Sequence, residues 1–250
     1  MSAFITAFDA EARQSSKKGG GEFRFRSGFL YGRVDYNSLS HSTNAVTTFD
    51  GSQYGARADL EVWFSSKLGV LLDGSYMQAE LLDNSNRFRG DPIYHAWGAF
   101  NFGYRLFGNG GATGSEFVTF AGPALEWFSD VRAYRGETFY DLNRPQVLGL
   151  KLGARWRWAF AKNYVSEIGG FWILPFTLRG TGSNNTLNKG ATRSYGSTVS
   201  VEKRIAHGIN LGAGFNYEQH RLEYKIGGAP GPQVVDFNLT TALFFIRFWF

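Results

Sequence analysis

The residues of this sequence that could perform acid–base chemistry are two histidines and two glutamates. His95, His220, Glu126 and Glu218 fall at similar heights near the ends of predicted β-strands. An imidazole beside a carboxylate can act as a general base, and a hydrolase or acyltransferase also needs a nucleophile at the same level. No serine lies beside these residues in a recognisable motif. We therefore expect no catalytic residue, and an enzyme that uses His95 or His220 is the alternative.

Other chemistry is not indicated. The glycine-rich turn at 108–114 lacks the Lys-Ser/Thr ending and the helix of a phosphate-binding loop. The chain has no cysteine, which excludes disulfides, thiolate metal sites and cysteine nucleophiles. No metal-ligand spacing stands out, so we expect neither a metal nor a cofactor. The net charge of +5 is spread along the chain without a basic face, so we expect no nucleic-acid partner.

Most charged residues alternate with apolar ones, which is the pattern of a β-strand with two unlike faces. The stretches 54–64 and 148–160 show this pattern most clearly. The charged or titratable residues of the polar faces are Arg57, Asp59, Glu61, Asp73, His95, Lys151, Arg155, Arg157, Glu167, Glu202, Arg204, Glu218, His220 and Arg247.

The same periodicity predicts ten strands. They cover residues 23–36, 54–64, 68–82, 93–106, 117–128, 148–160, 164–178, 192–205, 209–224 and 234–250. A bulge is expected after Gly32, where the alternation weakens, and an irregularity is expected at Pro123, which has no N–H to donate. Short turns near 66, 110, 162 and 207 alternate with longer polar loops near 45, 87, 137, 185 and 229.

The last strand carries the strongest signal. Ala242, Phe244, Ile246, Phe248 and Phe250 share one face, and the chain stops at the last of them. This stretch resembles the closing strand of bacterial outer-membrane β-barrel proteins, although no particular family is identified. The resemblance implies that Ile246, Phe248 and Phe250 form the signal read by the barrel-assembly machinery. It also implies a place in the bacterial outer membrane, with lipid and lipopolysaccharide as neighbours.

Alternation alone would also fit a soluble ligand-binding β-barrel, whose apolar face points inward. Two features favour lipid outside. The predicted strands are long, whereas soluble strands have about five or six residues. Aromatic residues gather near the strand ends as two girdles. One girdle contains Phe64, Trp158, Phe160, Tyr164, Phe248 and Phe250, and the other contains Tyr36, Tyr76, Tyr94, Phe176, Tyr195 and Tyr217. We predict an all-β fold: a single closed antiparallel transmembrane β-barrel of about ten strands, with short periplasmic turns and longer extracellular loops.

The start of the chain differs in character from the rest. Residues 1–22 include Lys17-Lys18 followed by three glycines, and we expect a flexible periplasmic tail ahead of a barrel at 23–250. An exported barrel needs a signal peptide, and Met1 to Phe8 does not look like one. We expect that the signal has been removed; the other interpretations are that the chain is a segment of a longer protein or that it is not a membrane protein.

In a ring of ten strands, the predicted strands at 54–64 and 148–160 lie nearly opposite each other and run in the same direction. Asp59 and Glu61 should therefore lie at the height of Arg155 and Arg157, and ion pairs across the lumen should fill it, unless a small solvated passage remains. The expected function is that of a non-catalytic envelope anchor, a partner-binding scaffold or a narrow passive pore. A protein partner would bind at the polar loops, especially 129–145, or at the tail.

Overall fold

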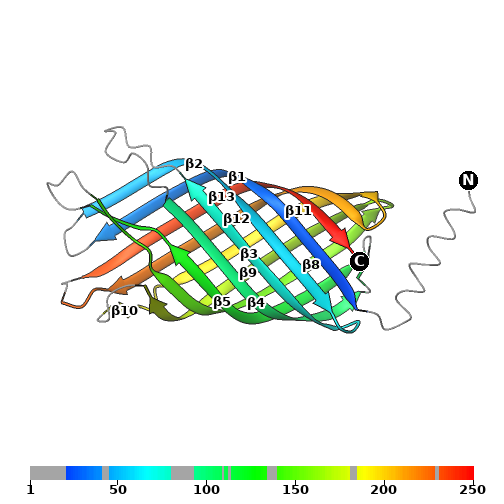
Figure 1. Cartoon of the computed structure of the whole chain (residues 1–250), viewed down its shortest axis with the longest axis horizontal. Coiled ribbons are helices and arrows are strands. Elements are labelled where there is room, and N and C mark those ends of the chain that lie inside the picture. The colour runs from blue at the N-terminus through cyan, green and yellow to red at the C-terminus, as the bar shows by residue number, and fades with distance from the viewer. Residues whose placement is uncertain are drawn as a thin grey trace, which may run out of the picture.

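Ten long antiparallel strands close into a barrel (Figure 1). The computed structural model describes residues 21–40, 45–79, 93–108, 110–111, 114–133, 140–180, 185–228 and 231–250. The barrel strands are β1 (Glu22–Ser40), β2 (Ala45–Trp63), β3 (Leu68–Ala79), β4 (Ile93–Gly108), β5 (Glu116–Phe128), β8 (Gln146–Ala161), β9 (Tyr164–Arg179), β11 (Arg193–Ala206), β12 (Ile209–Lys225) and β13 (Pro232–Trp249). The short β10 (Thr186–Leu187) pairs with β12, and β6 (Asp130–Ala133) forms a separate hairpin with β7 (Tyr140–Asn143).

The terminal strand closes the ring. β13 pairs with β12 on one side and with β1 on the other, and the pairing with β1 runs without interruption from Arg24↔Trp249 to Ser40↔Gln233. Closure leaves no open sheet edge, which a strand structure in hydrocarbon requires because no water is present to satisfy the backbone. The predicted fold class is confirmed. No helix in the described part of the chain is long and apolar enough to cross a bilayer.

β1 begins and β13 ends at the same end of the barrel, which we call the turn end (Figure 1). The connections 64–67, 162–163 and 207–208 lie there. The opposite end, which includes the β6–β7 hairpin, is the loop end. The predicted tail at 1–22 lies almost wholly outside the described residues, and its last residue, Glu22, is the first residue of β1.

Apolar side chains cover the outside of the barrel and charged ones are buried. Phe102 and Phe215 are 64% and 72% exposed, whereas Arg24 and Arg157 are 2% and 0% exposed. A protein in water would bury these aromatic rings and expose the guanidinium groups, because the rings gain and the charges lose free energy on leaving water. The inverted arrangement is that of a barrel surrounded by lipid.

Two predictions about the first hairpin are wrong. β1 contains no bulge after Gly32, because its register with both neighbours is continuous. The predicted loop at 37–52 is mostly strand, since β1 continues to Ser40 and β2 begins at Ala45. Here the apolar side chains, Val34 and Tyr36, point inward while Asp35 is exposed, so the outward apolar stripe that marked the other strands is missing. For the same reason Tyr36, which is 1% exposed, does not belong to an outer girdle.

In β5 the irregularity predicted at Pro123 is present, whereas the segment after β5 differs from the prediction. Opposite Pro123 the pairing of β4 with β5 is interrupted between Ala99↔Ala124 and Phe102↔Ala121, and the register is the same on both sides. The predicted loop at 129–145 contains the β6–β7 hairpin. The buried side chains of Asp130 and Val131 show that the start of this hairpin packs against the barrel.

Candidate functional site

The interior of the barrel has two layers. The ionic layer lies toward the turn end and consists of charged side chains from opposite walls. The apolar layer lies toward the loop end. Its main members are Leu30, Val34, Tyr36, Phe49, Met77, Ile93, Phe128, Val131, Val147, Leu222, Tyr224, Val235, Phe237, Leu239, Leu243 and Phe245. The sequence predicted the ionic layer, but it did not indicate the apolar one.

At the bottom of the ionic layer, the fully buried Glu116 binds two arginines. Arg24 makes a two-pronged contact with its carboxylate, one prong being 2.9 Å long, and Arg105 Nε lies 2.8 Å from Oε2. Trp63 and Trp249 cover these guanidinium groups: Arg105 stacks 4.1 Å from the Trp63 ring centroid, and Arg24 stacks 4.2 Å from that of Trp249. The charges are thus paired and also shielded from water by aromatic faces.

Above this cluster, ion pairs cross the lumen. Arg155 Nη1 and Nη2 lie 2.6 and 3.0 Å from the two oxygens of Glu61, which is the juxtaposition expected from the ring geometry. Glu167 accepts from Arg26 at 2.9 Å and from Arg247 at 2.8 Å. The strands that supply the Arg155–Glu61 and Arg26–Glu167 pairs are four places apart in the ring of ten, so each pair joins nearly opposite walls.

The remaining charges complete this layer. Glu202 accepts from Arg157 at 3.0 Å and from Arg247 at 2.7 Å. Asp59, which was also expected to pair across the lumen, pairs with Arg26 on the neighbouring strand β1. Lys151 pairs with Asp73, and its ammonium group lies 3.9 Å from the centroid of the Trp97 ring.

Arg57 is held mainly by neutral groups. Its Nη1 donates to the Thr198 hydroxyl and to the Asn216 side-chain oxygen, each at 3.1 Å. The carboxylates of Asp59 and Glu218 lie farther away, at 3.6 and 3.9 Å. Arg57 therefore sits where the ionic layer meets the histidines above it.

Arg204 is the exception among the predicted lumen residues. It is partly exposed, and its contacts are the Ala206 carbonyl at 3.4 Å and the ring of His207 at 3.3 Å. The β11–β12 register shifts between Arg204 and Ala206, so the strand ends here and its last inward position lies at the rim. Arg204 does not join the ionic layer.

Sequence reasoning missed several members of the ionic layer: Glu22, Arg24, Arg26, Arg105 and Glu116. Arg24 and Arg26 alternate with Phe23 and Phe25, so their inward direction could have been read from the sequence. Glu116 was missed because the predicted strand began one residue later.

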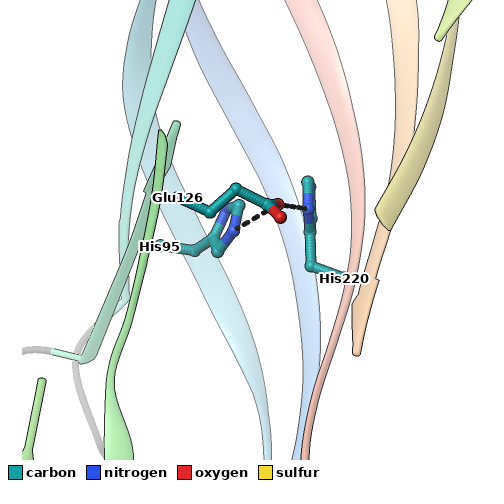
Figure 2. Close-up of side chains that lie close together, drawn as sticks. All are labelled: His95, Glu126 and His220. Carbon is teal, nitrogen blue, oxygen red and sulfur yellow. Dashed lines mark hydrogen bonds and ion pairs between the residues drawn. The ribbon is translucent and has the colours of Figure 1, made fainter. Parts of the chain in front are cut away.

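His95, Glu126 and His220 meet in the upper part of the lumen, within the apolar layer (Figure 2). They come from β4, β5 and β12 and are at most 1% exposed. The Glu126 carboxylate points between the two rings, with Oε1 2.9 Å from His220 Nδ1 and 3.7 Å from His95 Nε2. The ring centroids of the histidines lie 3.8 Å apart.

The other ring nitrogen of His220 is also engaged. Nε2 lies 3.0 Å from Glu218 Oε2, and Glu218 in turn accepts from Trp97 Nε1 at 2.9 Å and from the Asn216 amide at 2.8 Å. The four residues that the sequence placed at similar heights therefore meet: hydrogen bonds join Glu126, His220 and Glu218, and the His95 ring lies beside them.

This group does not have the geometry of a serine hydrolase. Ser194 pairs with His220 in the β11–β12 register, and its buried hydroxyl has no hydrogen-bond partner. Both nitrogens of His220 contact carboxylates, so neither is free to take a proton from Ser194.

The ionic layer leaves little empty space. A cavity of about 50 Å³ lies in its middle, beside Asp73, Lys151, Arg155 and Phe171. Since one water needs about 10–15 Å³ measured in this way, the cavity has room for a few waters rather than for a solute.

The loop end is covered by the start of the β6–β7 hairpin. Asp130, which is fully buried, accepts hydrogen bonds from Tyr224 at 2.7 Å, Ser38 at 3.0 Å and Gln233 at 3.0 Å. The Val131 amide donates to the Tyr36 hydroxyl at 2.9 Å. These bonds hold β6 against β1, β12 and β13.

No protein-family model matches the chain, and no curated protein matches it in sequence. The structure is similar to the outer membrane protease OmpT from Escherichia coli, with a TM-score of 0.50, 9% identity, and coverage of 92% of this chain and 96% of that one. It is less similar to the outer membrane protein OprG from Pseudomonas aeruginosa, with a TM-score of 0.41, 12% identity and the same coverages. The COG4313 outer membrane channel from Pseudomonas putida F1 has a TM-score of 0.42, 9% identity and again the same coverages. At these identities the likeness concerns the fold: this chain has the fold of bacterial outer-membrane β-barrel proteins.

Proposed function

We propose that this protein is a non-conducting barrel of the bacterial outer membrane. It binds a protein partner at its loop end and so anchors that partner at the membrane. The observation that carries the proposal is the filled lumen. Ion pairs such as Arg155–Glu61 join nearly opposite walls, and the apolar layer and Asp130 lie above them.

A passage would require several of these buried ion pairs to separate together. Breaking one buried pair typically costs about 3–5 kcal/mol, because it leaves a charge without its partner in a medium of low polarity. The closed form should therefore predominate, and transient opening should be rare.

The anchor role is supported by the loop end. The β1–β2 hairpin continues beyond Tyr31 and Tyr54, which face each other on the outer surface, and carries the exposed residues Arg33, Asp35 and Asp50 there. Charged groups at these positions are unfavourable in hydrocarbon and suit water or a protein surface. A two-stranded extension past the lipid is a suitable platform for a partner.

Planar-bilayer recording in concentrated KCl tests the closed lumen. We expect no stepwise conductance from the wild type or from Lys203→Ala, which changes an outward-facing side chain at the turn end. A variant in which Glu61→Ala and Arg155→Ala are combined with replacement of residues 130–143 by a Gly-Ser linker keeps the other ion pairs and most of the apolar layer, and should show at most brief openings. Insertion of each protein is verified by flotation with vesicles. Reproducible conductance steps in the wild type would refute the proposal.

A further inference from the structure

The three side chains of Figure 2 have the composition of a metal-ion site. His95, Glu126 and His220 each offer one ligand atom, and these atoms all lie within 4.8 Å of one another. Two imidazole nitrogens and one carboxylate oxygen form a common protein ligand set for Zn²⁺, with a fourth position left for water or another ligand.

The spacing of the donor atoms fits such an ion. With bonds of about 2.0–2.2 Å, the ligand atoms of a tetrahedral zinc site lie roughly 3.3–3.6 Å apart. The distances from Glu126 Oε1 are 2.9 Å to His220 Nδ1 and 3.7 Å to His95 Nε2, one slightly below and one slightly above this range. The third distance, between the ligand nitrogens of the two histidines, is at most 4.8 Å, so the two rings must move closer together to form the site.

One of the donors is otherwise unsatisfied. His95 Nε2 is buried and has no hydrogen-bond partner among the residues that the structure describes. A buried polar atom without a partner typically costs about 1–3 kcal/mol. The rings of Phe128 and Phe237, whose centroids lie 5.1 and 5.5 Å from that of His95, keep the surroundings apolar. A bound cation would satisfy this nitrogen where no other protein group does.

The second donor, His220, is oriented as a metal ligand. When its Nε2–H donates to Glu218, the tautomer is fixed and the lone pair of Nδ1 faces Glu126 and His95. Histidines that bind metals commonly donate their other N–H to a carboxylate in this way. Trp97 and Asn216 hold Glu218 in place from the other side.

Charge also favours a cation. Among the described residues, the side chains within ion-pairing distance of the Glu126 carboxylate are the two imidazoles, with no arginine or lysine. Nitrogen donors together with a carboxylate suit Zn²⁺ better than Ca²⁺ or Mg²⁺, which prefer oxygen ligands.

We propose that His95, Glu126 and His220 bind one Zn²⁺ ion, which ties opposite walls of the barrel together. β12 lies five places from β4 and four from β5 in the ring of ten, so the ligands come from across the lumen. The ion would act as a cross-brace within the apolar layer and reinforce the closure of the barrel.

The test uses the full chain, without a histidine tag, refolded in detergent with and without ZnCl₂. Refolding in the presence of zinc is needed because the site is buried. After gel filtration, elemental analysis should find one zinc per chain, and the thermal midpoint of unfolding should be higher with Zn²⁺ than with Mg²⁺. Refolding with Co²⁺ should give the intense visible absorption of a tetrahedral site.

Three variants locate the site. His95→Ala should lose the bound zinc and the Co²⁺ spectrum. Glu218→Gln leaves all three ligands in place and should weaken binding by about 10–100-fold. His207→Ala removes a histidine at the turn end and should bind zinc like the wild type. The proposal is overturned if the wild type, refolded with zinc supplied, contains no bound zinc. It is also overturned if His95→Ala retains one zinc per chain with an unchanged Co²⁺ spectrum.

Discussion

Replacing Glu116 with glutamine should remove the negative charge that holds a group of buried guanidinium ions together. Its carboxylate contacts Arg24 and Arg105 directly, and Arg155 Nη2 lies 3.8 Å away. Glu116 is fully buried, and the side chains of Arg24 and Arg105 are 2% exposed, so little water is present to replace the lost charge.

The expected loss of stability follows from this burial. Removing one partner of a buried ion pair costs about 3–5 kcal/mol, which lowers the folding equilibrium constant by roughly two to more than three orders of magnitude. Glutamine has nearly the same shape as glutamate, so packing around Trp63 and Trp249 should change little. The loss should therefore be due to charge rather than to a cavity.

Equilibrium unfolding by guanidinium chloride in lipid vesicles, followed by tryptophan fluorescence, measures this loss. Asp50→Asn is the matched control, since it removes a carboxylate from an exposed pair with Arg33 and should leave the unfolding midpoint almost unchanged. If Glu116→Gln were as stable as the control, the ionic layer would be hydrated and the lumen would not be closed there.

Three further predictions concern the wall, the loop end and assembly. A Cβ at Gly32 would lie 2.0 Å from the Thr240 carbonyl oxygen, whereas a Cβ at Gly98 would meet nothing within 4 Å. Gly32→Ala should therefore lower the unfolding midpoint, and Gly98→Ala should not. Equal midpoints for the two variants would contradict this. Asp130→Asn weakens three hydrogen bonds to a charged acceptor, each worth about 1.5–3 kcal/mol. Hydrogen exchange at the Val131 amide should therefore become at least tenfold faster. Unchanged exchange would show that Asp130 does not hold the hairpin. Phe250→Ala should reduce assembly in bacterial outer membranes but leave refolding in detergent nearly unchanged. The control Phe23→Ala alters the ring whose centroid lies 5.6 Å from that of Phe250, and it should assemble normally. Normal assembly of Phe250→Ala would exclude this residue from the assembly signal.

The alternation of side chains was enough to predict which way most residues point. Arg57, Asp59 and Glu61 alternate with apolar neighbours, and this period is the same whether a strand is seen in sequence or in the sheet. The meeting of Glu61 with Arg155 also follows from strand order and direction alone.

The sequence was less informative where the barrel leaves the lipid. Tyr36 and Val34 face inward, and their strand is polar outside, so the rule that apolar residues face outward is reversed there. The apolar layer was missed for this reason.

The histidine cluster shows a second limit. The positions of His95, Glu126 and His220 along their strands predict similar heights, but their distances across the lumen depend on the tilt and stagger of the closed ring. No short motif could reveal this group, because its members come from three strands that are far apart in the sequence.

Lipid surrounds the apolar face of the barrel wall, and the side chains of the other face fill the lumen. Trp172 is 55% exposed on the outer surface, and its neighbour Phe171 packs 5.0 Å from the inward-facing Trp97, so the two tryptophans lie at similar depth on opposite sides of the wall. Lipids brominated on their acyl chains quench the fluorescence of tryptophans that contact the hydrocarbon. Two variants each retain one of these tryptophans and carry phenylalanine at the other tryptophan positions, and their quenching tests this arrangement directly. We predict strong quenching of Trp172 and little quenching of Trp97. Equal quenching of both, or stronger quenching of Trp97, would contradict the account.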